Sequence, residues 1–396
     1  MTHTLVFFPD YRAANPYQTL LYEHAGRDLH PRFGSIAEAV ALQRHRGVGS
    51  RVIFHLHWED AVYRNEPDED AAWRAAQRFI GELETFQDNG GQLVWTLHNE
   101  APHDGRYLPV HTQLSARLAT LADVVHVHSL AGTGFARQRL GIDPARLALA
   151  PHGSYVGLYP RLGYPIASSR AALGLGEARR VLLLFGRLGR YKGGPELLAA
   201  FARLAGADLW LVIAGKQIEP LSALLGELPA TVRRRIVVLD RFVPDAELPQ
   251  LFHASDMVAL PYRASLTSGS ALLALSQARP VLAPALPGLA ELLGDGTDAL
   301  LYRPDAADGL EVTLRRLLAL DARQLAVMQQ AARAKAELLD LRSSGLLLDG
   351  IYARLLATLR PQRASATADL EPVAADAGAA PASIVHPLRP VAADAA

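Results

Sequence analysis

The chain has 396 residues, half hydrophobic and a fifth charged, so its length and composition predict two or three globular domains. Forty basic residues balance forty acidic ones, which argues against a general nucleic-acid binder, because such proteins carry a basic excess. The absence of cysteine excludes disulfides, thiolate metal sites and cysteine nucleophiles. No apolar run of about 18 residues predicts a membrane-spanning helix, and the first residues lack the basic flank of a signal peptide. We therefore expect a cytoplasmic protein.

Residues 1–165 alternate short apolar runs with helical patterns. Strands are predicted at Thr4–Phe8, Arg51–Trp58, Gln92–His98, Asp123–His128 and Leu147–Ala150, and a helix at Asp70–Phe86. This alternation indicates a parallel sheet covered on both faces, and therefore a Rossmann-like N-terminal domain. Pro, Gly and Ser cluster at Pro160–Arg170, where we place the seam.

Residues 166–340 repeat the pattern and predict a second Rossmann-like domain. Its strands are expected at Arg180–Phe185, Leu209–Ala214, Arg235–Leu239, Met257–Leu260 and Pro280–Ala283, and its helices at Gly194–Ala205, Glu219–Leu228, Leu248–His253 and Ser270–Gln277. A helical pattern runs from Ala306 to Leu359, and we assign residues 341–360 to a separate C-terminal helix. The Ala- and Pro-rich residues 361–396 are expected to form a disordered tail.

The expected fold class is thus α/β, with two doubly wound domains facing a cleft. Ligands of such sheets bind outside the carboxyl ends of the strands. The residues just after each predicted strand are therefore the candidates for function.

The most informative segment follows the first strand of the second domain and reads FGRLGRYKGG, residues 185–194. Gly186 permits a tight turn, and the helix after the loop offers free N–H groups to an anion. Arg187 can bind phosphate oxygens through its guanidinium group, and Lys192 adds a point charge. We interpret the segment as a phosphate-binding loop; the alternative is a glycine turn with two solvated cations.

A second segment, residues 262–273, lies between the strand at Met257–Leu260 and a helix. Thr267, Ser268, Gly269 and Ser270 stand at the start of that helix, where N–H groups could hold a diphosphate. Helix capping without any ligand explains the same residues.

Titratable groups cluster after two strands of the first domain. His57, Trp58 and Asp60 follow one strand, and His98, Glu100, His103 and Asp104 follow another. A carboxylate there could act as a general base, and a histidine could orient a sugar hydroxyl or a phosphate. Asn15 and Tyr17 follow the first strand and either line the same cleft or simply begin a helix.

These segments together resemble the GT-B glycosyltransferases. Residues 186–193 are similar to the Gly-Arg-x4-Lys-Gly donor loop of that family, so the resemblance assigns the donor diphosphate to Arg187 and Lys192. The nearer resemblance is to the xanthan-type GDP-mannose:glycolipid β-mannosyltransferase family of exopolysaccharide biosynthesis. It rests on NPYQTLLYE (15–23), HLHW (55–58), TLHNEAPHD (96–104), HGSY (152–155), RYKG (190–193) and LTSGSALLALSQARPVLAP (266–284).

The sequence departs from the large retaining group of that fold, which carries Glu-x7-Glu before a Gly-x-Pro-Val segment. Ser265 and Leu273 stand at the two glutamate positions, and Ala278 replaces the glycine. The departure agrees with the mannosyltransferase group and implies GDP-mannose as donor, with inversion. Inversion needs one base: Asp104 is the first candidate, followed by Asp60 and Glu100.

The resemblance also distributes the other roles. His98, Gly186, Thr267, Ser268, Gly269 and Ser270 are expected beside the donor, and Asn15, Tyr17, His57, Trp58 and His103 on the acceptor side. No metal or other cofactor is expected, because cations and helix N-termini can meet the leaving diphosphate. A lipid-linked acceptor would imply peripheral contact with the inner membrane, for which Arg74, Arg78 and Arg117 on amphipathic helices are the candidates.

Three alternatives remain open at this point. The chain could be a retaining transferase that uses a UDP-sugar, or a sugar-nucleotide epimerase, because those isomerases share the two-domain fold. It could also be a non-catalytic protein that binds a sugar nucleotide or a glycan without turnover.

Overall fold

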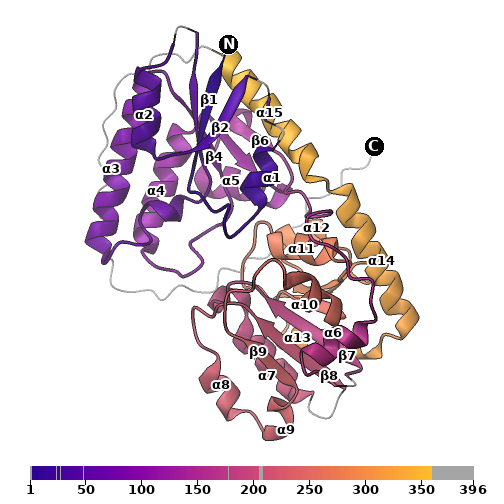
Figure 1. Cartoon of the computed structure of the whole chain (residues 1–396). Coiled ribbons are helices and arrows are strands. Elements are labelled where there is room, and N and C mark those ends of the chain that lie inside the picture. The colour runs from indigo at the N-terminus through magenta and orange to yellow at the C-terminus, as the bar shows by residue number, and fades with distance from the viewer. Residues whose placement is uncertain are drawn as a thin grey trace, which may run out of the picture.

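The computed structural model describes residues 2–358 except 24, 27, 48, 177 and 205–207. The tail expected at 361–396 lies outside the described residues. Two lobes, each built on a parallel sheet, lie one above the other (Figure 1).

The first lobe holds a six-stranded sheet in the order β2-β1-β3-β4-β5-β6. Its strands are β1 (His3–Phe8), β2 (Leu29–Phe33), β3 (Val52–Leu56), β4 (Gln92–Thr96), β5 (Val124–Val127) and β6 (Leu147–Leu149), and its helices are α1 (Tyr17–Tyr22), α2 (Ile36–Arg44), α3 (Glu69–Asp88), α4 (Leu108–Leu121) and α5 (Leu130–Leu140). Every residue of β3 and β4 is buried, as a strand covered on both faces requires.

The second lobe repeats this design with the order β12-β11-β10-β7-β8-β9. Its strands are β7 (Arg180–Phe185), β8 (Leu209–Ala214), β9 (Ile236–Leu239), β10 (Met257–Ala259), β11 (Val281–Pro284) and β12 (Ala299–Tyr302). Its helices are α6 (Ile166–Ala172), α7 (Gly194–Arg203), α8 (Ser222–Glu227), α9 (Ala230–Arg233), α10 (Leu248–Ala254), α11 (Gly269–Ser276), α12 (Pro287–Leu292) and α13 (Gly309–Ala319). All strand pairs in both sheets are parallel, so the carboxyl ends of each sheet meet at one edge.

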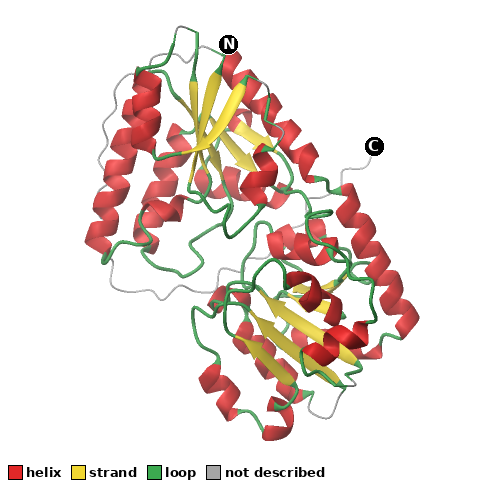
Figure 2. Cartoon of the chain, viewed as in Figure 1, coloured by secondary structure: helices red, strands yellow, loops and turns green. Residues whose placement is uncertain are grey.

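Each sheet separates two hydrophobic layers. In the first lobe, α2, α3 and α4 cover one face, and α1 and the C-terminal helix cover the other. In the second lobe, α7 and α13 cover one face, and α10, α11 and α14 (Ala322–Leu338) the other. Figure 2 shows these helices flanking the two sheets.

The chain returns to the first lobe at its end. Helix α15 (Leu341–Ala357) leaves the second lobe and packs beside α1. It also contacts β4, because the side-chain amide of Gln92 donates to the backbone oxygen of Leu355 at 2.7 Å. Figure 1 shows α14 and α15 running along one side of both lobes. The single helical pattern expected over Ala306–Leu359 therefore corresponds to α13, α14 and α15.

Strands β2 and β12 were not among the predicted strands. Both lie at the edge of their sheet. Strand β2 is exposed at three of its five positions and therefore has few apolar residues, whereas β12 is apolar but only four residues long. Pro31 is accommodated in β2 because an edge strand need not donate a hydrogen bond on its outer side.

Two contacts join the lobes on the side of α5. The hydroxyl of Ser129 donates to the backbone oxygen of Leu266 at 2.8 Å. The carboxylate of Glu291 on α12 accepts from the backbone N–H groups of Leu130 and Ala131, at 2.8 and 3.1 Å. Glu291 thus satisfies the free N-terminus of a helix in the other lobe.

Candidate active site

A cavity of about 880 Å³ lies between the lobes, at the carboxyl ends of both sheets. Trp58, His98 and His152 line it after β3, β4 and β6, and Gly186 and Gly215 line it after β7 and β8. This is the place that the doubly wound topology reserves for a ligand.

The loop after β7 has a backbone that only glycine can follow. Gly186 has a φ of +106°, and a Cβ there would lie 2.7 Å from Nζ of Lys192. Gly193 has a φ of +66°, and a Cβ there would lie 2.0 Å from the backbone oxygen of Pro261. The two glycines therefore let the loop fold tightly around the Lys192 side chain.

Lys192 is buried, with 5% of its surface exposed, and its ammonium group has fixed partners. Nζ donates to the backbone oxygen of Phe185 at 2.9 Å and to the hydroxyl of Ser270 at 3.4 Å. It also lies 5.3 Å from the ring centre of Tyr262. Arg187, by contrast, is exposed and lines the cavity.

The contact between Lys192 and Ser270 brings the two predicted donor segments together. Ser268 is the N-cap of α11, and its hydroxyl accepts from the N–H of Ala271 at 3.1 Å. All the residues expected beside the donor line the cavity: Gly186, Arg187, Lys192, His98, Thr267, Ser268, Gly269 and Ser270.

Two of the three positions that differ from the retaining group also face this cavity. Ser265 and Leu273 both line it, so no carboxylate is presented from either position. Ala278 follows α11 with a φ of +55°, a left-handed conformation that glycine adopts more easily.

Most of the residues assigned to the acceptor side line the cavity as well. Asn15, Tyr17, Trp58 and His103 are at its wall, and the ring of Trp58 stacks on His98 with centroids 4.2 Å apart. His57 is fully buried behind the wall, and its Nδ1 lies 3.3 Å from Nε2 of His98.

His103 lies against the donor loop of the opposite lobe. Its ring stacks on Tyr191, with centroids 4.1 Å apart and an angle of 14°. Burial, together with the charges of Lys192 and Arg187, lowers the pKa of His103 to about 4, so the ring is neutral near pH 7. A residue assigned to the acceptor side thus also bridges the cleft.

None of the three candidate carboxylates lines the cavity. Asp104 is exposed beside His103, and it accepts from the backbone N–H of Arg106 at 3.0 Å. Asp60 forms an ion pair with Arg64 at 3.5 Å, and burial raises its pKa, with a smaller contribution from the Asp104 charge.

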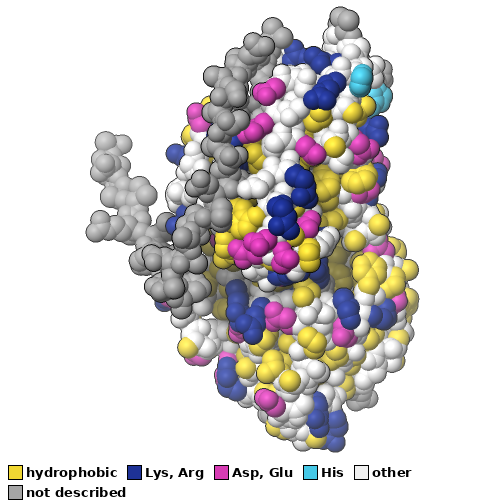
Figure 3. All heavy atoms as spheres, turned by 90° about the vertical axis from the view of Figure 1, so that its left-hand side faces the viewer, with side chains coloured by type: hydrophobic (Ala, Val, Ile, Leu, Met, Phe, Trp, Pro, Cys, Tyr) yellow, Lys and Arg dark blue, Asp and Glu magenta, His cyan; other side chains and the backbone are white. Residues whose placement is uncertain are grey.

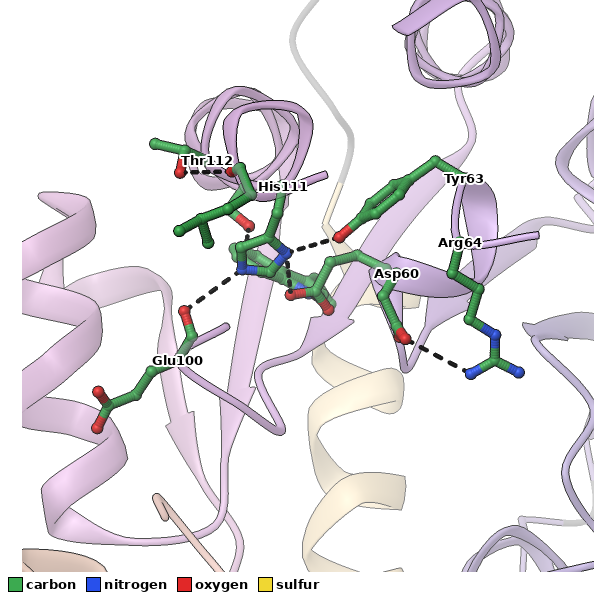
Figure 4. Close-up of polar contacts among 10 residues, drawn as sticks. Asp60, Tyr63, Arg64, Glu100, His111 and Thr112 are labelled. Atoms are coloured by element: carbon green, nitrogen blue, oxygen red, sulfur yellow. Dashed lines mark hydrogen bonds and ion pairs between the residues drawn. The ribbon is translucent and has the colours of Figure 1, made fainter. Parts of the chain in front are cut away.

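Glu100 lies apart from the other two carboxylates. Its backbone oxygen is 3.3 Å from Nε2 of His111, while its carboxylate points away from Asp60 and His111 (Figure 4). The structure therefore brings Asp60 and Asp104 close enough for their charges to interact and leaves Glu100 outside that pair.

A buried cluster beneath the rim was missed as a unit. Glu59 is 5% exposed, and its carboxylate accepts a hydrogen bond from Nε1 of Trp95 at 3.3 Å. The same carboxylate lies 3.9 Å from Nδ1 of His111. This ring nitrogen is also 3.0 Å from the hydroxyl of Tyr63. Burial raises the pKa of Glu59 to about 8. No sequence motif contains His111, so only the fold could place it beside Glu59.

The sequence analysis named His57 but missed the group of buried histidines behind the cavity wall to which it belongs. His55 and His57 are two residues apart, as are His126 and His128, so each pair points to one face of the sheet. That spacing was the available signal. Among the described residues, no group of three or more His, Asp or Glu side chains could hold a metal ion.

Two Rossmann-like lobes, with the glycine-containing loop after β7 opening onto a cavity between them, form the architecture of the GT-B glycosyltransferases. The sequence profile of the family described as "Glycosyl transferases group 1" matches residues 179–320. The "GDP-mannose:glycolipid 4-beta-D-mannosyltransferase" of Xanthomonas campestris pv. campestris is 30% identical over 276 residues, covering 68% of this chain and 70% of that relative. The chain belongs to this glycosyltransferase family.

Other similarities are weaker in sequence. A "D-inositol 3-phosphate glycosyltransferase" of Segniliparus rotundus is 28% identical over 251 residues, covering 62% of this chain and 54% of that relative. Among solved structures, sucrose-phosphate synthase from Thermosynechococcus elongatus matches with a TM-score of 0.66 at 17% identity, covering 90% of this chain and all of that one. Anabaena HepE in complex with UDP-glucose matches with a TM-score of 0.65 at 18% identity, covering 89% of this chain and all of that one. These structures bear out the GT-B fold.

Proposed function

We propose that this glycosyltransferase transfers mannose from GDP-mannose, with inversion, to a lipid-linked oligosaccharide or a related glycan in exopolysaccharide biosynthesis. The observation that carries the proposal is the 30% identity to relatives named for this donor and this linkage, over 68–71% of the chain. The missing carboxylates at Ser265 and Leu273 agree with it, because a retaining family member would present glutamates there.

In the proposed reaction a base removes the proton of the acceptor hydroxyl while its oxygen attacks the anomeric carbon of mannose. The bond from that carbon to the diphosphate oxygen breaks, and GDP leaves with the bonding electrons. Arg187, Lys192 and the N–H groups at the start of α11 stabilise the charge that develops on the diphosphate. These groups can supply the stabilisation that a metal ion supplies elsewhere, so we expect no metal requirement.

Asp104 is the proposed base. Its neighbour His103 lines the cavity, so movement of this one loop can carry the carboxylate to an acceptor hydroxyl. Asp60 is the second candidate, although its ion pair with Arg64 competes for the same oxygens. Glu100 is the third candidate, and its outward carboxylate makes it the weakest.

The acceptor and the place of action belong to the proposal as well. None of the described helices is long and apolar enough to cross a bilayer. We propose a cytoplasmic enzyme that meets its lipid-linked acceptor at the inner membrane, through Arg74 and Arg78 on α3 and Arg117 on α4. Figure 3 shows basic and acidic side chains interspersed on the viewed face, so the attraction of this face to a membrane would come from these single arginines and not from a continuous basic surface.

Thermal unfolding with GDP, UDP, ADP and dTDP tests the donor. A ligand that binds only the folded state adds about 2.7 kcal/mol at a hundredfold excess over its Kd. Stabilisation by GDP alone supports the proposal. Stabilisation by UDP alone refutes GDP-mannose as the donor and favours a UDP-sugar transferase or an epimerase. If no nucleotide stabilises the protein, a glycan-binding protein is favoured.

Product analysis tests the chemistry. GDP-mannose incubated with a lipid-linked oligosaccharide should give a β-mannoside, read from the anomeric signal in the NMR spectrum. An α-linked product would refute inversion. Conversion of the donor without any acceptor would indicate an epimerase.

A further inference from the structure

A polar network is buried behind the cavity wall, where the ends of β3, β4 and β5 meet α1 and α15. Its members are Tyr22, His55, His57, Thr96, His98, His126, Ala150 and Tyr352, joined by hydrogen bonds. Burial lowers the pKa of each of these histidines, so all of them are neutral and each carries one ring proton.

The backbone oxygen of Ala150 sets the direction of the first hydrogen bonds, because a carbonyl can only accept. Nε2 of His126 lies 2.9 Å from this oxygen and must therefore carry the proton of His126. Nδ1 of His126 is then bare and accepts from the hydroxyl of Thr96 at 2.9 Å. The Thr96 oxygen in turn accepts from Nε2 of His55 at 2.7 Å.

His55 is thereby left with a bare Nδ1 that needs a donor. Two phenol hydroxyls reach it: that of Tyr352 on α15 at 2.8 Å and that of Tyr22 on α1 at 2.7 Å. The Tyr22 hydroxyl also lies 2.6 Å from Nε2 of His57. Since each phenol has one proton, the partner that Tyr22 chooses decides the rest of the network.

If Tyr352 donates to His55, Tyr22 is free to donate to His57. Nδ1 of His57 then carries its proton and donates to Nε2 of His98 at 3.3 Å. His98 must in this case hold its own proton on Nδ1. If Tyr22 instead donates to His55 or to the oxygen of Tyr352, every bond beyond it reverses, and Nδ1 of His98 is bare.

We propose that Tyr352 holds His98 in the tautomer that presents an N–H group to the cavity. His98 lines the cavity, its Nε2 faces His57, and the described residues supply no hydrogen-bond partner for its Nδ1. An N–H at this place suits the oxygens of a donor diphosphate or of a sugar, whereas a bare nitrogen would repel a phosphate. Tyr352 is thus a positioning residue that acts through His98.

This assignment rests on the proposed function for the identity of the ligand but not for the network itself. It also gives the returning helix a role in catalysis: α15 supplies the one hydroxyl that leaves Tyr22 free. Without it, Tyr22 must serve His55, because a buried ring nitrogen without a partner is costly.

The test is the variant Tyr352→Phe, studied by 15N NMR of protein labelled at histidine. Protonated and bare ring nitrogens differ widely in 15N shift, and the His98 signals are identified by their loss in His98→Asn. In the unmodified protein we expect the proton of His98 on Nδ1. In Tyr352→Phe we expect it on Nε2.

The second readout is the affinity for GDP-mannose, which should fall roughly tenfold to a hundredfold in Tyr352→Phe. Tyr63→Phe is the matched control, since Tyr63 is equally buried in the same lobe and its hydroxyl also meets a histidine, His111, at 3.0 Å. The control should lose a similar amount of thermal stability while the His98 signals and the GDP-mannose affinity stay unchanged.

A double-mutant cycle separates positioning from general damage. In His98→Asn the side-chain amide offers an N–H group whatever the network does, so adding Tyr352→Phe should change the affinity by less than about twofold. An undiminished effect in that background would overturn the proposal, as would a His98 tautomer that is the same with and without Tyr352. If the unmodified protein binds no GDP-mannose, the proposed function fails, and the NMR comparison still decides the network.

Discussion

Replacement of Lys192 by methionine separates the donor role of this residue from a purely structural one. Methionine has a similar length and no charge, so Lys192→Met removes the hydrogen bonds to Phe185 and Ser270 and leaves the loop filled. A hydrogen bond to a charged group contributes about 1.5–3 kcal/mol. If the ammonium group also meets the donor diphosphate, the affinity for GDP should fall about tenfold to a hundredfold.

The assay is isothermal titration with GDP, accompanied by a thermal unfolding curve of each variant. Arg190→Met is the matched control, because Arg190 lies in the same loop, is 74% exposed, pairs with Glu219 at 3.0 Å and does not line the cavity. It should bind GDP within about twofold of the unmodified protein, since exposed ion pairs contribute little. A Lys192→Met protein with a lower melting temperature and an unchanged Kd would refute the donor role and leave Lys192 as a structural cation.

Three further predictions concern other parts of the molecule. Asp104→Asn should lower kcat by about a hundredfold or more with little change in the Kd for GDP, whereas Glu100→Gln should leave kcat and Kd unchanged. If a steady-state assay shows the same loss of kcat in both variants, Asp104 is not the base. Glu59 has its pKa raised to about 8, so the folded state binds a proton that the unfolded state releases, and stability falls as pH rises from about 5 to 8. Glu59→Gln abolishes this loss, and its melting temperature relative to the unmodified protein should climb over that range; a constant difference would show that Glu59 ionises normally. Glu291→Ala leaves two N–H groups of α5 without their acceptor and should cost about 1 kcal/mol in unfolding free energy, while Glu247→Ala, which breaks an exposed pair with Arg241, should cost less than half of that.

The central strands could be predicted because they are covered on both faces and consist almost entirely of apolar residues. The edge strands β2 and β12 could not, since LHPRF has few apolar residues and ALLY, although apolar, is only four residues long. Their places depend on the neighbouring strand, which local sequence does not record.

The place of the predicted donor residues at the cavity followed from chain order alone, because parallel strands bring their carboxyl ends to one edge. The direction of a side chain does not follow in this way. Asp60, Glu100 and Asp104 were chosen for their place after strands, yet none of the three reaches the cavity wall. The part played by Tyr352 was beyond the reach of sequence analysis, since almost three hundred residues separate it from His55.

The return of α15 to the first lobe also bears on the order in which the protein can fold during synthesis. Domains made on the ribosome usually fold from the N-terminus onward. Here the strands of the first lobe are made before the second lobe, but α15, which covers one face of their sheet and supplies Tyr352, is made after it. The second lobe, whose sheet is complete once β12 has emerged, can close first. The first lobe would then reach its native core after the second.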